Sequence, residues 1–281
     1  MEGIILKGLG SFYTISTDCG EVVCKLRGKL RLLKTPPLPG DRAIVSLLPD
    51  GTGWILELLP RKNMLVRPPV CNIDCLVLVV SQAPPVTDFY LIDRMTVSAR
   101  AVDIEPLICV NKQDISSGDG LLRLYSDAGF AVFPICALTG EGVDGLEKAI
   151  AKKSVAFAGN SGVGKSTLLN ALDPRLGRAT GELSEKLGRG KHTTRHVELF
   201  TLSCGALVAD TPGFSAFELA SDMEKSELAR LFIDFEPYIG LCRFSDCRHV
   251  GVQGCAVEAA VGNGIRPERY ESYKRMLAEM K

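Results

Sequence analysis

The sequence lacks a net charge, a long hydrophobic run and an export signal. Its 33 Lys and Arg residues balance 33 Asp and Glu residues, so the overall charge indicates no particular partner. The longest apolar run, CLVLVV at residues 75–80, has the length of a strand and is too short to span a membrane. The N-terminal stretch MEGIILKGLG has neither the basic and apolar regions nor the cleavage site of a signal peptide. We therefore expect a cytoplasmic protein with no membrane partner.

A disulfide framework is not expected either, although the chain has 10 cysteines. Seven of them are scattered through apolar or strand-like sequence, and the other three lie together with a histidine. That distribution is typical of a reducing compartment. With no internal repeat or low-complexity tract, 281 residues are enough for two or three domains.

The first 67 residues have the pattern of short strands separated by turns. Strand-like stretches occupy residues 11–16, 21–33, 41–48 and 53–59, and turn signals stand at Asp18-Cys19-Gly20, Pro39-Gly40 and Asp50-Gly51. Five short strands in about 60 residues are typical of a small closed barrel.

One of these stretches carries a basic stripe. Lys25, Arg27, Lys29 and Arg31 occupy odd positions, while leucine or glycine occupies the even positions between them. Because side chains alternate along a strand, the cations are predicted to share one face. Residues 1–67 contain 10 basic and 6 acidic residues. The stripe is either a site for a nucleic-acid backbone or an ordinary solvated strand face.

Residues 68–220 alternate between strand and helix patterns. Apolar strand-like runs occur at 75–80, 107–110, 131–135, 155–158, 197–202 and 206–209. Helical spacing predicts helices over 87–102, with Thr87 as the N-cap, and over 120–129, with Gly129 at the C-terminal end. This alternation predicts a mostly parallel sheet covered by helices. Beyond residue 220 we expect helices over 223–235 and 267–280, with a cysteine-rich loop between them.

The stretch VAFAGNSGVGKST at residues 155–167 has the form of a phosphate-binding loop. A strand leads into a glycine-rich turn and then a helix, so backbone N–H groups and the helix N-terminus face phosphate oxygens. Lys165 would reach the outer phosphates, and the Ser166 hydroxyl would ligate Mg²⁺. The residues assigned to nucleotide binding here are Gly159, Asn160, Ser161, Gly162, Val163, Gly164, Lys165, Ser166 and Thr167.

The stretch NKQD at residues 111–114 favours guanine as the base. It follows a predicted strand, which places it at the sheet edge where doubly wound folds bind ligands. The Asp114 carboxylate can accept bonds from guanine N1–H and the 2-amino group, and adenine offers neither donor in that arrangement. Asn111 would support the loop and Lys112 would lie along the purine. Cys136, Ala137 and Leu138 follow another strand, where a backbone N–H can meet guanine O6.

The stretches 188–195 and 210–214 have the character of switch segments. Asp210, after a predicted strand, would hold Mg²⁺ through water, and the Gly213 N–H would contact the γ-phosphate. Thr194 is our choice for the second protein ligand to Mg²⁺, and Thr193 is its rival.

Four residues of types that ligate metals lie within 14 positions near the C-terminus. Cys242, Cys247, His249 and Cys255 are soft or borderline donors suited to one closed tetrahedral Zn²⁺ site. A helical core of reduced cysteines is the alternative, but the intervening sequence is polar and rich in glycine. Four protein ligands leave no open position, so the predicted zinc is structural.

In the order NKQD, CAL, GNSGVGKS, HTT and DTPG, the chain resembles the circularly permuted GTPases. With a preceding barrel and a following Cys/His cluster, it resembles the bacterial ribosome small subunit-dependent GTPase A family. The resemblance implies an OB-fold barrel over 1–67, a permuted P-loop GTPase domain over 68–220 and a mainly helical zinc-binding domain over 221–281. It also implies a monomeric GTPase that binds 16S rRNA on the 30S subunit during late maturation. The chain departs from the family at Cys136 and in HVGVQGC.

The catalytic residue is chosen by position and by the resemblance. Phe214 stands where many GTPases have a glutamine that orients water, and it cannot do so. His192 lies beside the candidate Mg²⁺ threonines, and the resemblance favours it as the group that orients or deprotonates water. A solvent-exposed histidine without that role is the alternative.

Three functions therefore remain open. The first is a GTPase stimulated by the 30S subunit, the second a metabolic P-loop phosphotransferase, and the third an RNA-binding module that senses GTP or GDP without turnover. In the first, the permutation makes DTPG the last nucleotide motif, so that GTP-dependent ordering after residue 210 can reposition the zinc domain.

Overall fold

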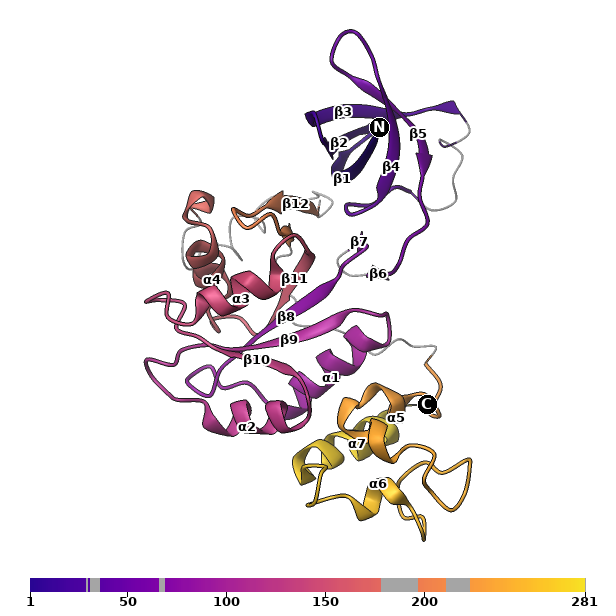
Figure 1. Cartoon of the computed structure of the whole chain (residues 1–281), viewed down its shortest axis with the longest axis vertical. Coiled ribbons are helices and arrows are strands. Elements are labelled where there is room, and N and C mark those ends of the chain that lie inside the picture. The colour runs from indigo at the N-terminus through magenta and orange to yellow at the C-terminus, as the bar shows by residue number, and fades with distance from the viewer. Residues whose placement is uncertain (29, 31–35, 66–68, 178–196, 211–222, 281) are drawn as a thin grey trace.

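The computed structural model describes residues 1–28, 30, 36–65, 69–177, 197–210 and 223–280. These residues form a barrel, a central sheet covered by helices and a C-terminal helical region, arranged in a row (Figure 1). No helix among them has both the length and the apolar character needed to cross a membrane.

The N-terminal barrel is closed and has five strands, as the sequence predicts. The strands pair in the order β1-β2-β3-β5-β4, and β1 closes the barrel against β4. This is the strand number of an OB-like barrel. Buried side chains such as Ile5, Ile15, Cys24 and Ile55 fill the interior. The strands are β1 Glu2–Leu9, β2 Phe12–Thr17, β3 Gly20–Leu26, β4 Arg42–Leu47 and β5 Gly53–Leu58.

The predicted basic stripe does not lie on one strand. Strand β3 ends at Leu26, and the backbone of Gly28 is left-handed with φ 49°. A strand cannot continue through that conformation, so Lys25 lies on the strand and Arg27 lies beyond it. Both are exposed. Lys29 and Arg31 lie outside the described residues.

The central sheet has six strands in the order β10-β9-β8-β11-β13-β12. The first five are parallel and β12 is antiparallel to β13, so the predicted mostly parallel sheet is confirmed. The strands are β8 Cys75–Val80, β9 Glu105–Val110, β10 Ala131–Pro134, β11 Ser154–Ala158, β12 Glu198–Thr201 and β13 Leu207–Asp210.

Helices cover both faces of this sheet (Figure 1). Helices α1 Phe89–Arg100 and α2 Asp119–Asp127 pack on one face, and α3 Val143–Ile150 and α4 Lys165–Leu172 pack on the other. The N-cap of α1 is Asp88 and not Thr87, because the Asp88 carboxylate accepts from the Tyr90 N–H. The Thr87 hydroxyl instead accepts from the Ser81 N–H.

Short elements connect and complete these bodies. A hairpin of β6 Met64–Leu65 and β7 Val70–Cys71 leads from the barrel to the sheet, and the 3₁₀ turn η2 Pro174–Leu176 follows α4. The C-terminal region contains α5 Leu228–Leu231, the 3₁₀ segment η3 Ile233–Tyr238, α6 Ala256–Ala259 and α7 Pro267–Glu279.

The helix predicted over 223–235 is therefore mostly wrong, whereas the one over 267–280 is confirmed. Helix α5 has only four residues, because Phe232 takes an extended conformation that ends it. Phe232 and Phe235 are fully buried in the C-terminal core. Burial of these two rings against α7 outweighs the local helical pattern.

Candidate functional site

The predicted nucleotide loops gather at one edge of the sheet. They follow the C-terminal ends of β9, β10 and β11, which are the strand ends where open α/β sheets bind ligands. Their order in the chain does not matter to this arrangement, since adjacent parallel strands present their ends to the same edge.

The phosphate loop packs so closely that two of its glycines cannot be replaced without a shift. Gly159 has φ +146°, and a Cβ there would lie 2.2 Å from the Val79 carbonyl oxygen. Gly164 has φ +104°, and a Cβ there would lie 2.2 Å from Asn111 Nδ2. The glycine spacing therefore serves packing against β8 and the NKQD loop, as well as the approach of a phosphate.

Lys165 begins α4 and turns back over the loop. Its Nζ donates to the carbonyl oxygens of Gly159 and Asn160, at 2.7 and 2.8 Å. Burial lowers the pKa of Lys165 from its usual value. The ammonium thus lies inside the loop that is predicted to hold the phosphates. Ser166 and Thr167 follow in the first turn of α4, where the helix N-terminus favours an anion.

Asn111 ties three loops together. Its Nδ2 donates to the Val163 carbonyl oxygen at 2.9 Å, and its Oδ1 accepts from the Ala137 N–H at 2.9 Å. The side chain is buried, with 3% exposed. The predicted supporting role of Asn111 matches these contacts. A contact between the Ala137 N–H and guanine O6 would have to be shared with Asn111.

Asp114 lies at the open end of the same loop. It is exposed, and its Oδ1 accepts a bond from the Cys136 thiol at 3.2 Å. The sequence analysis assigned no definite role to that thiol. Leu138, the last residue of the tripeptide, is 78% exposed.

The loop 81–88 after β8 also borders the nucleotide site, and the sequence analysis did not identify it. Lys112, which has φ +66°, donates from Nζ to the Pro84 carbonyl oxygen at 2.5 Å. The loop is closed by bonds between Ser81 and Thr87, and Pro85 lies beside Gly162 of the phosphate loop. Its position directly after a strand that ends at the same edge is the signal that could have identified it.

Most of the predicted switch residues cannot be located in the site. His192, Thr193, Thr194 and Gly213 lie outside the described residues. Asp210 ends β13 at the nucleotide edge, and its side chain is not described. The structure thus brings together the phosphate loop, NKQD and CAL, while the Mg²⁺ and catalytic assignments remain predictions.

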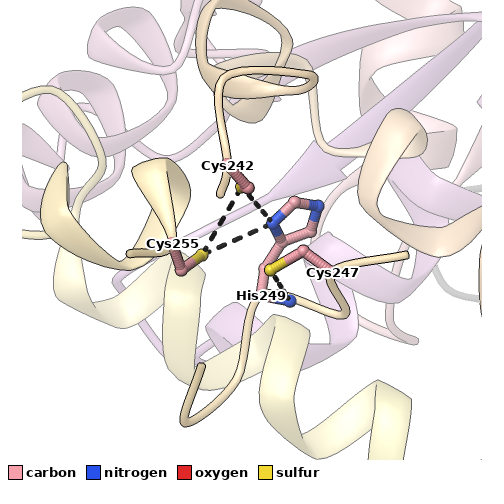
Figure 2. A group of neighbouring side chains, drawn as sticks. All are labelled: Cys242, Cys247, His249 and Cys255. Carbon is pink, nitrogen blue, oxygen red and sulfur yellow. Dashed lines mark hydrogen bonds between the residues drawn. The ribbon is translucent and has the colours of Figure 1, made fainter. Parts of the chain in front are cut away.

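The predicted metal ligands converge in the C-terminal region (Figure 2). The ligand atoms of Cys242, Cys247, His249 and Cys255 all lie within 4.8 Å of one another. His249 Nδ1 is 3.4 Å from Cys242 Sγ and 3.5 Å from Cys255 Sγ, and the two sulfurs are 3.9 Å apart. A tetrahedron with bonds of about 2.3 Å has edges of about 3.8 Å, so the four donors fit one tetrahedral metal ion.

Backbone groups prepare these donors for a metal. N–H groups of Ala256, His249 and Glu258 point at the sulfurs of Cys242, Cys247 and Cys255, at 3.3–3.4 Å. Such bonds favour the thiolate, which is the form that ligates metals. The tyrosines of α7 hold the loop that carries His249. Tyr270 donates to the carbonyl oxygen of His249, and Tyr273 donates to that of Arg248.

The RsgA GTPase family matches residues 58–220, and the RsgA N-terminal domain matches residues 2–55. A protein named small ribosomal subunit biogenesis GTPase RsgA from Caldanaerobacter subterraneus subsp. tengcongensis is 44% identical over 285 residues, covering 100% of this chain and 96% of that protein. Its namesake from Moorella thermoacetica is 44% identical over 283 residues, covering 100% and 97%.

Two solved structures are similar along the whole chain. YloQ, described as a circularly permuted GTPase, has a TM-score of 0.85 and 34% identity, covering 99% of this chain and 94% of its own. YjeQ from Thermotoga maritima has a TM-score of 0.85 and 35% identity, covering 99% and 98%.

Proposed function

The chain belongs to the RsgA GTPase family and is a GTPase, and from this premise we propose that it acts on the small ribosomal subunit during late maturation, is stimulated by that subunit and binds its 16S rRNA. The structural observation that supports the proposal most directly is the position of Asn111. Through Val163 and Ala137 it joins the phosphate loop, NKQD and CAL into one nucleotide site.

Base recognition is assigned to Asp114. An Asp114→Asn variant should weaken GDP and relatively favour xanthosine diphosphate, whose 2-oxo group accepts from an amide. Competition between the two nucleotides measures this preference. An unchanged preference for GDP would exclude Asp114 as the reader of the base.

GTP is bound with Mg²⁺, as in other GTPases, and we assign the protein ligands to Ser166, Thr194 and Asp210. The γ-phosphate contact is assigned to the Gly213 N–H, and His192 to the attacking water. What supports Ser166 is its place in the first turn of α4, directly after Lys165.

The Cys/His group is proposed to hold one structural Zn²⁺. Three sulfurs and one imidazole nitrogen at tetrahedral spacing are donors that zinc prefers. They supply four ligands, so no position remains for a reacting water.

RNA binding is assigned to the barrel, with Lys25 and Arg27 as its exposed cations and Lys29 and Arg31 as further candidates. Lys25 Nζ lies 4.6 Å from the centre of the Phe12 ring, which is 48% exposed. A cation beside an exposed ring is a surface that suits RNA phosphates and bases. We propose that this barrel ends near residue 67, that the GTPase domain ends near residue 220, and that the protein acts as a cytoplasmic monomer.

Measuring GTP hydrolysis with and without purified 30S subunits tests the proposal. We expect slow hydrolysis alone and faster hydrolysis with 30S, and a Lys165→Ala variant controls for contaminating phosphatases. Hydrolysis that 30S does not change would contradict the proposed partner. Binding of 30S without any phosphate release would instead identify a nucleotide-sensing module.

A further inference from the structure

We propose that Leu6 of the barrel is a positioning residue for the binding of GTP with Mg²⁺, because it holds the edge strand β12, and β12 in turn holds the backbone of Asp210. The inference rests on the proposed assignment of Asp210 as a ligand of Mg²⁺. It gives the barrel a part in nucleotide binding that does not require the ribosomal subunit.

The backbone of Asp210 depends on β12. Asp210 is the last residue of β13, and its partner in the antiparallel ladder is Glu198, the first residue of β12. The parallel ladder between β11 and β13 stops one residue earlier, at Ala209. Among the described residues, Glu198 is therefore the strand partner of Asp210. Because ladder partners fix each other's backbone, a shift of β12 is passed to Asp210 directly.

Strand β12 is supported by the barrel as well as by the sheet. It is the last strand of the described sheet, where it pairs with β13 alone, and strand β1 of the barrel lies against it. Leu6 of β1 is 5% exposed and belongs to the same buried cluster as Val197 and Leu199, which precede β12 and lie within it. Ile4 of β1 packs against this cluster too. The barrel thus helps to set the position of β12.

An irregularity in β1 directs Leu6 to the GTPase domain. The pairing of β1 with β2 shifts between Ile5 and Lys7, so Leu6 has no partner on β2 and forms a β-bulge. Ile5 is buried inside the barrel, whereas Leu6 is buried in the cluster of the central sheet. Lys7 follows on the side of β12, since its Nζ donates to Glu198 at 2.6 Å. The bulge therefore presents two consecutive side chains to β12.

The test measures the factor by which Mg²⁺ strengthens the binding of a non-hydrolysable GTP analogue to the full chain without 30S. Dissociation constants are compared with saturating Mg²⁺ and in Mg²⁺-free buffer without a chelator, since a chelator would also remove zinc. In Leu6→Ala we expect this Mg²⁺ factor to fall by about two- to thirtyfold, the range of couplings that packed contacts transmit. The affinity without Mg²⁺ should stay at the wild-type value, because the loops assigned to phosphate and base follow other strands.

Two further variants separate positioning from barrel stability. Ile15→Ala opens a cavity in the barrel interior, where Ile15 is 0% exposed, and should keep the wild-type Mg²⁺ factor. Leu6→Met nearly keeps the volume of the side chain and should restore most of the factor. Equal reductions in Leu6→Ala and Ile15→Ala, or no restoration in Leu6→Met, would overturn the proposal. If Leu6→Ala does not fold, Ile4→Ala takes its place, and an unchanged factor in that variant would overturn the proposal as well.

An Asp210→Ala variant distinguishes this failure from that of the underlying assignment. If Mg²⁺ does not strengthen binding to the wild-type protein, or if Asp210→Ala leaves the Mg²⁺ factor unchanged, Asp210 is not a ligand of Mg²⁺ and the inference falls with that assignment. If Asp210→Ala removes the factor and Leu6→Ala keeps it at the wild-type value, only the positioning role of Leu6 is lost.

Discussion

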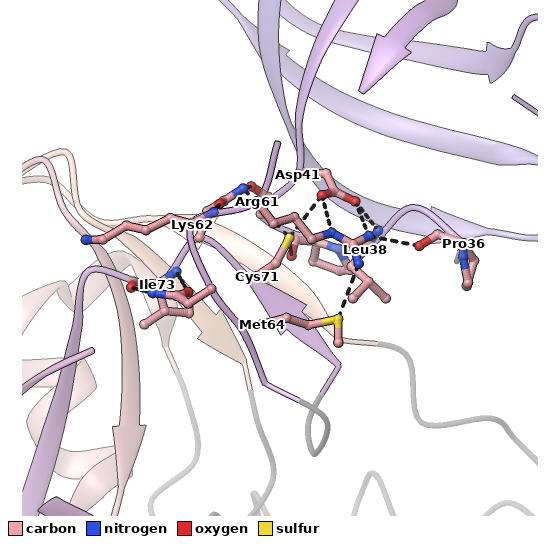
Figure 3. Close-up of polar contacts among 12 residues, drawn as sticks. Pro36, Leu38, Asp41, Arg61, Lys62, Met64, Cys71 and Ile73 are labelled. Carbon is pink, nitrogen blue, oxygen red and sulfur yellow. Dashed lines mark hydrogen bonds and ion pairs between the residues drawn. The ribbon is translucent and has the colours of Figure 1, made fainter. Parts of the chain in front are cut away.

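The barrel and the C-terminal region are attached to the GTPase domain in different ways. At the barrel, Asp41 is buried and forms a fork with Arg61, each bond 2.7 Å long, but the Arg61 side chain is 20% exposed (Figure 3). Cys71 and the Leu38 N–H also donate to Asp41. This network joins the start of β4 to the connection between barrel and sheet. The barrel also has an apolar contact with the GTPase domain, because Leu6 of β1 belongs to the same buried cluster as Leu199 of β12.

The C-terminal region instead shares a buried core with α1. Tyr90 and Val97 of α1 belong to the same apolar cluster as the tyrosines of α7. At its centre Arg269 is 0% exposed, bonded to Asp93 of α1 and to Asp234, and faced by aromatic rings including Phe232 at 4.9 Å. The region is therefore held by α1 as well as by the chain that follows DTPG.

The contrast changes the expected role of the permutation. If GTP repositioned the whole zinc domain through the segment after residue 210, it would have to separate α7 from α1 and expose the Arg269 pair. Separation would also expose the apolar and aromatic side chains that α1 and α7 share, at about 25 cal/mol per Å² of apolar surface, so small motions within the domain are favoured over its release. The barrel has an apolar contact too, but its ion pair is partly exposed at Arg61, whereas that of Arg269 is fully buried, so we expect a partner to move the barrel at lower cost.

Removing the metal should produce the largest effect, and it should be confined to the C-terminal region. Cys247→Ser, or chelation of the wild-type protein, removes a group whose binding stabilises small metal domains by about 10 kcal/mol or more. We expect loss of stoichiometric zinc by elemental analysis and faster hydrogen exchange over residues 240–260, with GDP affinity largely kept. Cys204→Ser, at a cysteine outside the cluster, is the matched control. Wild-type protein that carries no zinc would overturn the metal assignment.

Arg269→Ala should give the next largest effect. It leaves Asp93 and Asp234 buried without their cation, which costs about 3–5 kcal/mol. Urea denaturation measures the loss. Arg266→Ala is the control, because Arg266 pairs with Asp127 across the same two regions but is 46% exposed, and such a pair contributes about 0–1 kcal/mol. Equal losses in the two variants would show that the C-terminal region is not pinned by its buried charge.

The pH dependence of this loss has a definite sign. Burial raises the pKa of Asp93, and Arg269 opposes that rise. Without Arg269 the folded-state pKa of Asp93 rises further above its unfolded value, so the folded variant takes up a proton more readily than the unfolded chain. The deficit of Arg269→Ala should therefore shrink as the pH falls toward about 4, near the unfolded pKa of aspartate. A deficit that does not shrink would mean that the loss of Arg269 does not raise the pKa of Asp93 in the folded variant.

Arg61→Ala should have an intermediate effect at the barrel junction. It removes both bonds to Asp41 and leaves that carboxylate buried, which costs about 1–3 kcal/mol. Arg42→Ala is the control, since its pair with Glu2 lies within the barrel and is about half exposed. Limited proteolysis of the connection at residues 59–75 should become faster in Arg61→Ala alone. Equal cleavage of both variants would show that Asp41 and Arg61 do not fix the junction.

Sequence patterns predicted those features that are set by residues close together in the chain, such as strands and the metal-ligand spacing. The apolar runs gave the sheet strands to within two residues at each end, and the Cys/His spacing predicted a group that the fold does bring together. The prediction of one basic strand face was wrong at Gly28. The side chains alternate in type through this residue, but its backbone is left-handed and ends the strand pattern. Asp88 replaced Thr87 as a cap because the Thr87 hydroxyl is used by Ser81 in a bond across the loop.

The attachments between regions had no such local signal. Arg269 and Asp93 are 176 residues apart, and Arg61 and Asp41 are 20 residues apart in different connecting segments. A charged residue on a predicted helix normally faces solvent, so nothing in the pattern of α7 marked Arg269 as fully buried. The Cys136 thiol was unassigned for the same reason, since its partner Asp114 belongs to another loop.

The smallest expected effect concerns the contact between the barrel and β12, the strand that follows the predicted first switch. Lys7 of β1 pairs with Glu198 of β12 at 2.6 Å, and the two side chains are 46% and 51% exposed. Glu198 raises the pKa of Lys7 above 10.5 through this bond, so the contribution of the pair is complete below about pH 10.5 and is lost as the pH rises through the folded-state value. An exposed pair of this kind contributes about 0–1 kcal/mol.

A double-mutant cycle with Lys7→Ala and Glu198→Ala should therefore give a small coupling free energy in urea denaturation. The Lys153–Glu105 pair, similarly exposed but within the GTPase domain, is the control. If the Lys7–Glu198 coupling exceeds the control by more than about 1 kcal/mol, the pair fixes the barrel to β12 more firmly than an exposed ion pair can, and the contrast between the attachments of the barrel and of the C-terminal region weakens.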